Sequence, residues 1–261
     1  KERRGENTER LLHAGHEALI HAARKRAGTV VTTLFLNPTQ FGQNEDLARY
    51  PANRERDLEI MRKAGVDAVF VPSVEEMYPP DDHFAVDPGP IADVLEGEHR
   101  PGHMRAVATV VAKLFNATRP DLAYFGEKDG QQLEVVTRMS RDLRFGIEIV
   151  PVPTVRDERE LALSSRLAYL TDKERAAAEV VYRALCAARD HWDDGERSNV
   201  ELENIMKSVI ASESMATLGY AVVVDPDTFE RHAETNITSG AWALIAVTIG
   251  TTRLIDNLRL N

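Results

Sequence analysis

The sequence of 261 residues has a single cysteine, Cys186. One thiol cannot form an intrachain disulfide, and it disfavours a metal site built on several thiolates. Cys186 lies in VVYRALCAARD, on the apolar face of a predicted helix, where we expect a small buried thiol. The chain also shows no internal repeat and no low-complexity tract.

Excess positive charge and long apolar runs are missing as well. The formal net charge of −10 disfavours general binding of nucleic acid but permits a local basic pocket for a small anion. No apolar run approaches the roughly 18 residues of a membrane span, and the first residues contain no apolar core of a signal peptide. We expect a cytoplasmic protein without nucleic-acid or membrane partners.

Strand and helix signals alternate through the first half of the chain. The apolar runs at 29–36, 66–72, 121–125 and 146–152 predict strands. Helical spacing marks 53–65, which ends at Gly65, and 104–117, with Met104, Val107, Val111 and Leu114 on one stripe. A further helix runs through Leu133, Val136 and Met139. The alternation predicts an α/β fold with a mainly parallel sheet and helices on both faces.

The second half predicts a smaller α+β domain. Two helices begin at capping-box pairs, Thr171 with Glu174 and Ser198 with Glu201. Strands follow at 220–225, 241–249 and 252–260. The proline-punctuated VPVPTV suggests a boundary near Val155, which divides the chain into domains 1–155 and 156–261.

HAGH is the first motif that could carry chemistry, with His13 and His16 around Gly15. At a helix start, such a pair lies on one face beside backbone N–H groups that favour phosphate. Gly15 would permit close approach of a nucleotide. A metal site needs further ligands, and His21 lies off that face. Phosphate handling, ordinary histidines and metal binding stay open, in that order.

Two polar motifs follow predicted strands. NPTQF places Asn37 and Gln40 at the carboxyl end of the first strand, where an amide can hold a hydroxyl or a carboxylate; a plain polar turn is the alternative. FGEKDGQQ is a plausible phosphate and ribose cradle with Lys128 as a movable charge, although it lacks the Walker A spacing. A solvated helix start is the competing interpretation.

Two further motifs carry cations. LALSSR offers hydroxyls and a guanidinium that could clamp a polyphosphate, while the absence of a G-x-S-x-G elbow disfavours a serine nucleophile. EHRPGHMR concentrates Arg100, His103 and Arg105 in an otherwise acidic chain. Each residue could belong to an ordinary surface, and their joint occurrence is what favours a site.

Seven motifs in order, HAGH, NPTQF, ARYP, RPGHMR, FGEKDGQQL, LALSSR and GTTRLIDN, resemble the pantothenate synthetase (pantoate–β-alanine ligase) family from about His13 to the C-terminus. The resemblance implies a Rossmann-like nucleotidyltransferase domain with an HxGH signature, followed by a smaller lid domain. It implies attack of pantoate on ATP to give pantoyl adenylate and pyrophosphate, then release of pantothenate and AMP by β-alanine. It further implies Mg²⁺ with the ATP, a homodimer and a place in coenzyme A biosynthesis.

The resemblance also implies roles for single residues. His13 and His16 should face the ATP phosphates, with His16 as proton donor, and Lys128 should stabilise phosphate charge. The other residues matched to an ATP site are Gly126, Glu127, Asp129 at the ribose, Val155 at adenine, and Leu163, Ser164, Ser165 and Arg166 from the lid. Those matched to the pantoate and β-alanine sites are Gln40, Gln132 and, more loosely, Asn37, Arg100 and His103.

The segment before HAGH departs from the family pattern. Glu9 stands where a substrate-contacting methionine is expected, and Arg10 replaces a glycine. The polar KERRGENTER cannot supply an apolar first strand. Three explanations stay open. The strand is absent from this sequence but present in the protein, or the first strand is rearranged in an active synthetase, or the protein has kept the fold and lost efficient catalysis. Gly130, Glu160 and Leu167 replace an aromatic residue, a glycine and an asparagine.

Three functions follow from these observations. ATP-dependent pantothenate formation leads. A second is another HxGH adenylyltransferase that makes a dinucleotide cofactor, which the two glutamines and the LALSSR clamp disfavour. A third is a catalytically impaired relative that still binds nucleotide, which the departures keep open.

Overall fold

The computed structural model describes residues 12–40, 54–226, 228–231, 237–238 and 240–261. The chain divides into two compact units, Lys1–Gly126 with Gln132–Val152 and Glu127–Gln131 with Pro153–Asn261, here called unit 1 and unit 2. We propose that the chain consists of the two predicted domains, 1–155 and 156–261.

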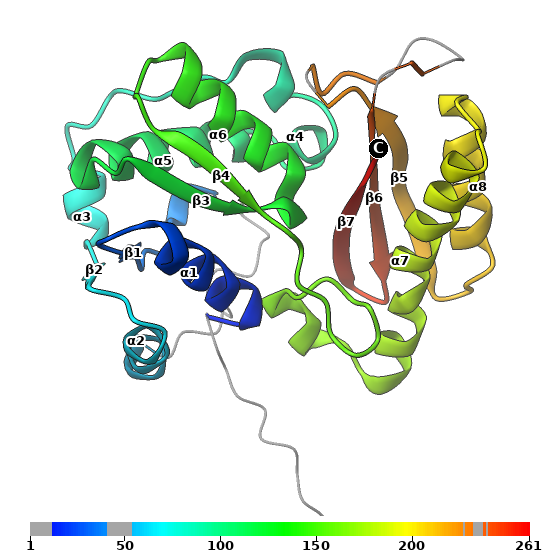
Figure 1. The fold of residues 1–261 in the computed structure, drawn as a ribbon, viewed down its shortest axis with the longest axis horizontal. Coiled ribbons are helices and arrows are strands. Elements are labelled where there is room, and N and C mark those ends of the chain that lie inside the picture. Colours follow the sequence, from blue (N-terminus) through cyan, green and yellow to red (C-terminus); the bar gives the residue numbers. More distant parts are fainter. Residues whose placement is uncertain (1–11, 41–53, 227, 232–236, 239) are drawn as a thin grey trace, which may run out of the picture. The chain divides into compact units, whose positions relative to one another are not determined.

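Unit 1 alternates short parallel strands with helices (Figure 1). Strand β1 pairs in parallel with β2, and β3 pairs in parallel with β4. Helix α1 packs against β3 and β4. The elements are α1 (Ala14–Arg26), β1 (Val31–Thr33), η1 (Pro38–Gln40), α2 (Arg54–Lys63), β2 (Ala68–Phe70), α3 (Val74–Met77), η3 (Gly89–Ala92), α4 (Glu96–His99), α5 (His103–Thr118), β3 (Leu122–Gly126), α6 (Gly130–Asp142, whose first two residues belong to unit 2) and β4 (Glu148–Val152).

The predicted helices of this half are confirmed, and their apolar stripes are buried. Met104, Val107 and Val111 of α5 are buried, although Phe115 rather than Leu114 completes the stripe. Strands β1, β2 and β4 are shorter than predicted, β3 is shifted by one residue, and the strands described form two separate pairs instead of one sheet. One reason is Pro72, just beyond β2, which has no N–H to extend a ladder.

Unit 2 places two long helices against an antiparallel sheet of order β5–β6–β7 (Figure 1). Its core includes Ala178, Leu185, Met206, Ile245 and Val247, all less than 1% exposed. This confirms the expected two helices followed by three strands. The elements are η4 (Glu127–Asp129), η5 (Ser165–Tyr169), α7 (Asp172–Asp193), α8 (Asn199–Ala211), β5 (Ala216–Val224), β6 (Ala241–Ile249) and β7 (Thr252–Leu260).

The two predicted capping boxes differ. Thr171 and Glu174 form the complete reciprocal box at α7. At α8, the Ser198 hydroxyl accepts from the Glu201 N–H, but the Ser198 N–H donates to the Glu196 carboxylate instead, at 2.7 Å. Cys186 on α7 is half-buried, so the expectation of a fully buried thiol is wrong. No helix in the described part of the chain is long and apolar enough to cross a membrane.

Candidate functional site

The histidine pair stands at the start of α1, where it caps the helix. His13 is the N-cap, and its Nδ1 accepts from the Gly15 N–H at 3.1 Å. The Nδ1 of His16 accepts from the His13 N–H at 3.3 Å. The two ring centroids are 4.1 Å apart. Because each Nδ1 needs its lone pair for these bonds, the neutral rings carry their proton on Nε2.

Gly15 serves this cap directly. A Cβ at position 15 would lie 2.8 Å from His13 Cε1, so a larger residue would displace the ring. His21, one turn and a half further on, is exposed, as expected for a helix-surface residue. No group of three metal-ligating side chains is present among the described residues, which leaves the metal alternative without support there.

The NPTQ segment forms a tight polar turn at η1. Asn37 is 2% exposed, and its Oδ1 accepts from the Thr39 hydroxyl at 2.9 Å and the Thr39 N–H at 3.2 Å. Its Nδ2 donates to Gln40 Oε1 at 3.5 Å. A buried amide therefore sets the turn and orients the side-chain carbonyl of Gln40.

Arg100 and His103 converge on the main chain of Gln40. Arg100 Nη2 and His103 Nδ1 lie 3.2 and 2.9 Å from the Gln40 carbonyl oxygen, and Arg100 Nη1 lies 2.8 Å from His103 Nε2. Since the guanidinium can only donate, His103 accepts on Nε2 and donates from Nδ1. The geometry thus favours support of Gln40 by this pair over direct substrate contact.

The remaining matched residues of unit 1 stand at strand and helix ends. Gly126 ends β3, and Gln132 is a half-buried residue in the first turn of α6. Glu9 and Arg10, where the sequence departs from the family pattern, lie outside the described residues. Unit 1 therefore contains two groups of contacting residues. One consists of His13 and His16, and the other of Asn37, Gln40, Arg100 and His103.

In unit 2, Glu127–Asp129 (η4, here called the lysine turn) and residues 163–166 (the serine clamp) both contribute to the lining of one cavity. Lys128 in η4 is 21% exposed at its side chain, and its Nζ lies 3.2 Å from Asp129 Oδ1. Ser164 caps η5 by accepting from the Arg166 N–H at 3.2 Å. The polar lining of the cavity consists of Lys128, Ser164, Arg166, Tyr182, Arg253 and Asp256.

A short hairpin presents the clamp. The Leu163 N–H donates to the Val155 carbonyl at 2.9 Å, and the backbones of Arg156 and Ala162 form an antiparallel β-bridge. Ser165 is half-buried at the start of η5. Glu160 turns this hairpin with φ of 62°, a left-handed conformation that favours glycine. This backbone conformation explains why the family pattern has glycine at position 160, and nothing in the structure explains the glutamate found there.

A buried ion pair that sequence reasoning missed includes Asp256, which lines the cavity. Arg156 donates to both Asp256 oxygens at 2.6 and 3.0 Å and lies over the Tyr182 ring at 3.7 Å. Burial raises the pKa of Asp256 above its ordinary value, and the Arg156 guanidinium opposes that shift. The available signal was a carboxylate, Asp256, within the predicted strand 252–260.

Comparisons with known proteins give one family, and each comparison covers nearly the whole chain. The model of the pantoate-beta-alanine ligase family matches residues 7–259. Pantothenate synthetase of Roseiflexus castenholzii is 50% identical over 246 residues, which cover 94% of this chain and 88% of that protein.

Solved structures agree as well. A crystal structure of pantothenate synthetase from Thermus thermophilus matches with a TM-score of 0.91 at 45% identity, covering 96% of this chain and 90% of the other. Pantoate-beta-alanine ligase from Francisella tularensis, complexed with beta-gamma ATP and beta-alanine, matches with a TM-score of 0.75 at 33% identity, covering 95% and 85%. The nucleotidyltransferase-type fold with an added lid is thereby confirmed.

Proposed function

The chain belongs to the pantoate-beta-alanine ligase family, and from this premise we propose that it activates pantoate as an acyl adenylate. Its overall reaction is the ATP-dependent condensation of pantoate with β-alanine. The observation that carries this conclusion is 50% identity to a pantothenate synthetase over 94% of the chain. A homodimer and a cytoplasmic location are part of the proposal.

His13 and His16 are assigned to the ATP phosphates, with His16 as proton donor. The support is the cap at α1, which uses Nδ1 of each ring and leaves the proton on Nε2. Neutral N–H donors beside a helix N-terminus stabilise negative charge without a charged side chain. These rings can therefore hold phosphate oxygens while the reaction proceeds.

Gln40 and Gln132 are assigned to pantoate, with Gln40 also near the β-alanine site. The Gln40 carbonyl is held by Arg100 and His103, and its side chain is oriented by buried Asn37. A side chain fixed in this way loses little conformational entropy when substrate binds. Arg100, His103 and Asn37 therefore act on the substrate through Gln40.

Lys128 and the serine clamp are assigned to the nucleotide. Lys128, Ser164 and Arg166 line one cavity, which supports binding of a polyphosphate by cations and hydroxyls together. Gly126, Glu127 and Asp129 belong to the same nucleotide loop, with Asp129 near the ribose. Val155 and the main chain from Leu163 to Ser165 are assigned to adenine and the phosphates.

The chemistry is two displacements. A pantoate carboxylate oxygen attacks the α-phosphorus of ATP, and the bond to the bridging oxygen breaks, releasing pyrophosphate. The β-alanine amine then attacks the acyl carbon, loses a proton and expels AMP. Catalysis rests on positioning and charge neutralisation, so no covalent enzyme intermediate is needed.

Mg²⁺ fits this site as a companion of ATP. No three metal-ligating side chains converge among the residues described, and Mg²⁺ is commonly bound through substrate phosphates and water with one or two carboxylates. Asp129 is a carboxylate beside Lys128 that could contribute. When bound, the ion would neutralise phosphate charge.

The test is a product assay with ATP, Mg²⁺, pantoate and β-alanine, in which AMP and pantothenate are measured. We expect equal amounts of both products, each dependent on pantoate and β-alanine. ATP binding without turnover would instead indicate a catalytically impaired relative. Formation of a dinucleotide from ATP and a mononucleotide would indicate another HxGH adenylyltransferase.

A further inference from the structure

We propose that Asn257 is a positioning residue for Lys128, and that Trp242 and Gly130 hold it in place. The inference rests on the function proposed above, because it assigns Lys128 to ATP. All four residues belong to unit 2. No motif argument assigned a role to Asn257 or Trp242.

One amide holds both peptide groups that flank the Lys128 Cα. Asn257 Nδ2 donates to the Glu127 carbonyl and to the Lys128 carbonyl, each at 2.8 Å. The first carbonyl belongs to the peptide before the Cα and the second to the peptide after it. Fixing both planes fixes φ and ψ at Lys128, and with them the direction in which its side chain leaves the backbone.

The orientation of the amide is set from its other end. Asn257 Oδ1 accepts from Trp242 Nε1 at 2.8 Å. Both side chains are buried, at 5% and 1% exposure. Asn257 thus uses two N–H donors and one acceptor for three partners. A flipped amide would place its NH₂ group against the Trp242 N–H and its oxygen against the two carbonyls.

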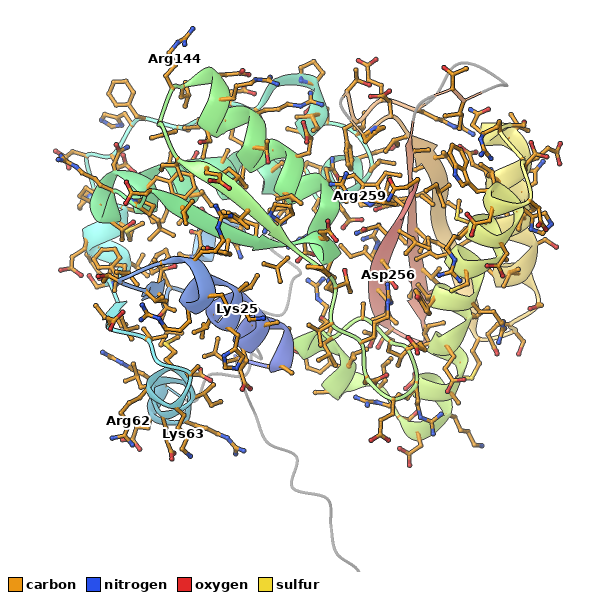
Figure 2. All side chains as sticks on the ribbon, viewed as in Figure 1. Lys25, Arg62, Lys63, Arg144, Asp256 and Arg259 are labelled. Carbon is orange, nitrogen blue, oxygen red and sulfur yellow. The ribbon has the colours of Figure 1, made fainter. Side chains whose placement is uncertain are left out.

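Strand geometry puts these groups on one face of the sheet. Asn257 and Arg259 are two residues apart on β7 and therefore point the same way, and Arg259 is the cross-strand partner of Trp242. Arg259 Cζ lies 4.2 Å from the Trp242 ring centroid, and Arg259 Nε lies 3.5 Å from a Glu127 carboxylate oxygen. Figure 2 labels Arg259 and Asp256, which both belong to β7.

Gly130 completes the fit. A Cβ at this position would lie 2.8 Å from Trp242 Cζ2 and 3.3 Å from Asn257 Nδ2. The indole therefore packs directly against the backbone at the start of α6, one residue past η4. A larger residue would push the turn away from the amide that holds it.

The decisive experiment replaces Asn257 in two backgrounds. Asn257→Asp keeps the size and the acceptor for Trp242 but removes both donors to the turn. In the native chain we expect a fall of roughly ten- to hundredfold in the rate of pantoate-dependent ATP–pyrophosphate exchange. In a Lys128→Ala background the same change should cost less than about twofold, because Asn257 acts through that lysine.

Direct ATP binding separates this inference from the proposed function. If the native protein makes no pantothenate, the function fails, yet calorimetric titration with Mg·ATP still tests the positioning role of Asn257. Weaker binding for Asn257→Asp in the native background but not in Lys128→Ala supports that role. Equal losses in both backgrounds, or unchanged exchange and binding, would overturn it.

Gly130→Ala provides a second variant should Asn257→Asp fail to fold. We expect the same selective loss, again absent with Lys128→Ala. The matched control is Gly28→Ala, because a Cβ at Gly28 meets nothing within 4 Å. A Gly130→Ala protein with native exchange and native ATP affinity would contradict the positioning of Lys128 from the sheet.

Discussion

The histidine cap in unit 1 and the lysine turn in unit 2 are supported over very different chain distances. The bonds that hold His13 and His16 join residues two and three positions apart. The bonds that hold the carbonyls around Lys128 come from Asn257, 130 and 129 positions away. The cap can form with its helix, whereas the turn is ordered only once β6 and β7 are in place.

This difference separates two ways of damaging one reaction. A substitution near the histidines acts on a local structure and on the atoms that the proposed function assigns to phosphate. A substitution in the distant sheet leaves every predicted ATP residue present and disturbs the direction of one of them.

The largest effect is expected at Lys128 itself. Lys128→Ala removes a charge from the cavity assigned to the nucleotide and should lower the adenylation rate by roughly 10²–10³-fold. The thermal midpoint should change little, since the side chain is partly exposed. Lys25→Ala, on the exposed side of α1, is the matched control and should behave as the native protein. Parallel losses of activity and stability would argue that Lys128 is structural.

Asp256→Asn should have the largest effect on stability. The substitution leaves the Arg156 guanidinium without its carboxylate, and breaking such a buried pair lowers the free energy of unfolding by about 3–5 kcal/mol. Glu148→Gln, which breaks the exposed pair with Arg26, should leave the free energy of unfolding almost unchanged, because solvent screens that pair. Urea unfolding of both variants measures the difference. Similar free energies of unfolding for the two would contradict the importance of the distant support.

These two kinds of support also explain what the sequence could predict. The start of α1, the Thr171 capping box and three of the four stripe positions of α5 follow from patterns within a few residues, and these are confirmed. The order of seven motifs indicated the family. None of these inferences required knowledge of long-range contacts.

The remainder depended on partners far apart in the chain. Arg156 meets Asp256 across 100 positions, and no local pattern pairs them. Gly130 departs from the family pattern, and the Trp242 indole that packs against it, from the distant strand β6, explains why a larger residue does not fit. Ser198 lost half of its predicted capping box to Glu196, a competitor that spacing alone does not reveal.

Substitution of His13 should separate its role as the N-cap of α1 from its proposed role in catalysis. His13→Ala loses the cap and about 1 kcal/mol of stability, whereas His13→Asn should retain most of it, because asparagine is a good N-cap. Both variants lack the Nε2 donor and should lose adenylation to a similar extent. If His13→Asn restores activity together with stability, the ring serves the helix and not the phosphates.

The smallest effect is expected at Arg259. Its ion pair with Glu127 is partly exposed, with side chains 39% and 26% accessible. Arg259→Gln should therefore change the adenylation rate by less than about fivefold, since such pairs contribute about 0–1 kcal/mol. Comparison with Asn257→Asp shows which support directs the turn. A loss at Arg259 equal to that at Asn257 would shift the role from the amide to the ion pair.

Pantoate-dependent exchange of labelled pyrophosphate into ATP tests the central claim most directly. The native protein, given ATP, Mg²⁺ and pantoate without β-alanine, should catalyse exchange, and addition of β-alanine should then release AMP and pantothenate. Exchange that does not require pantoate, or pantothenate formation without any exchange, would contradict a pantoyl adenylate formed at this site.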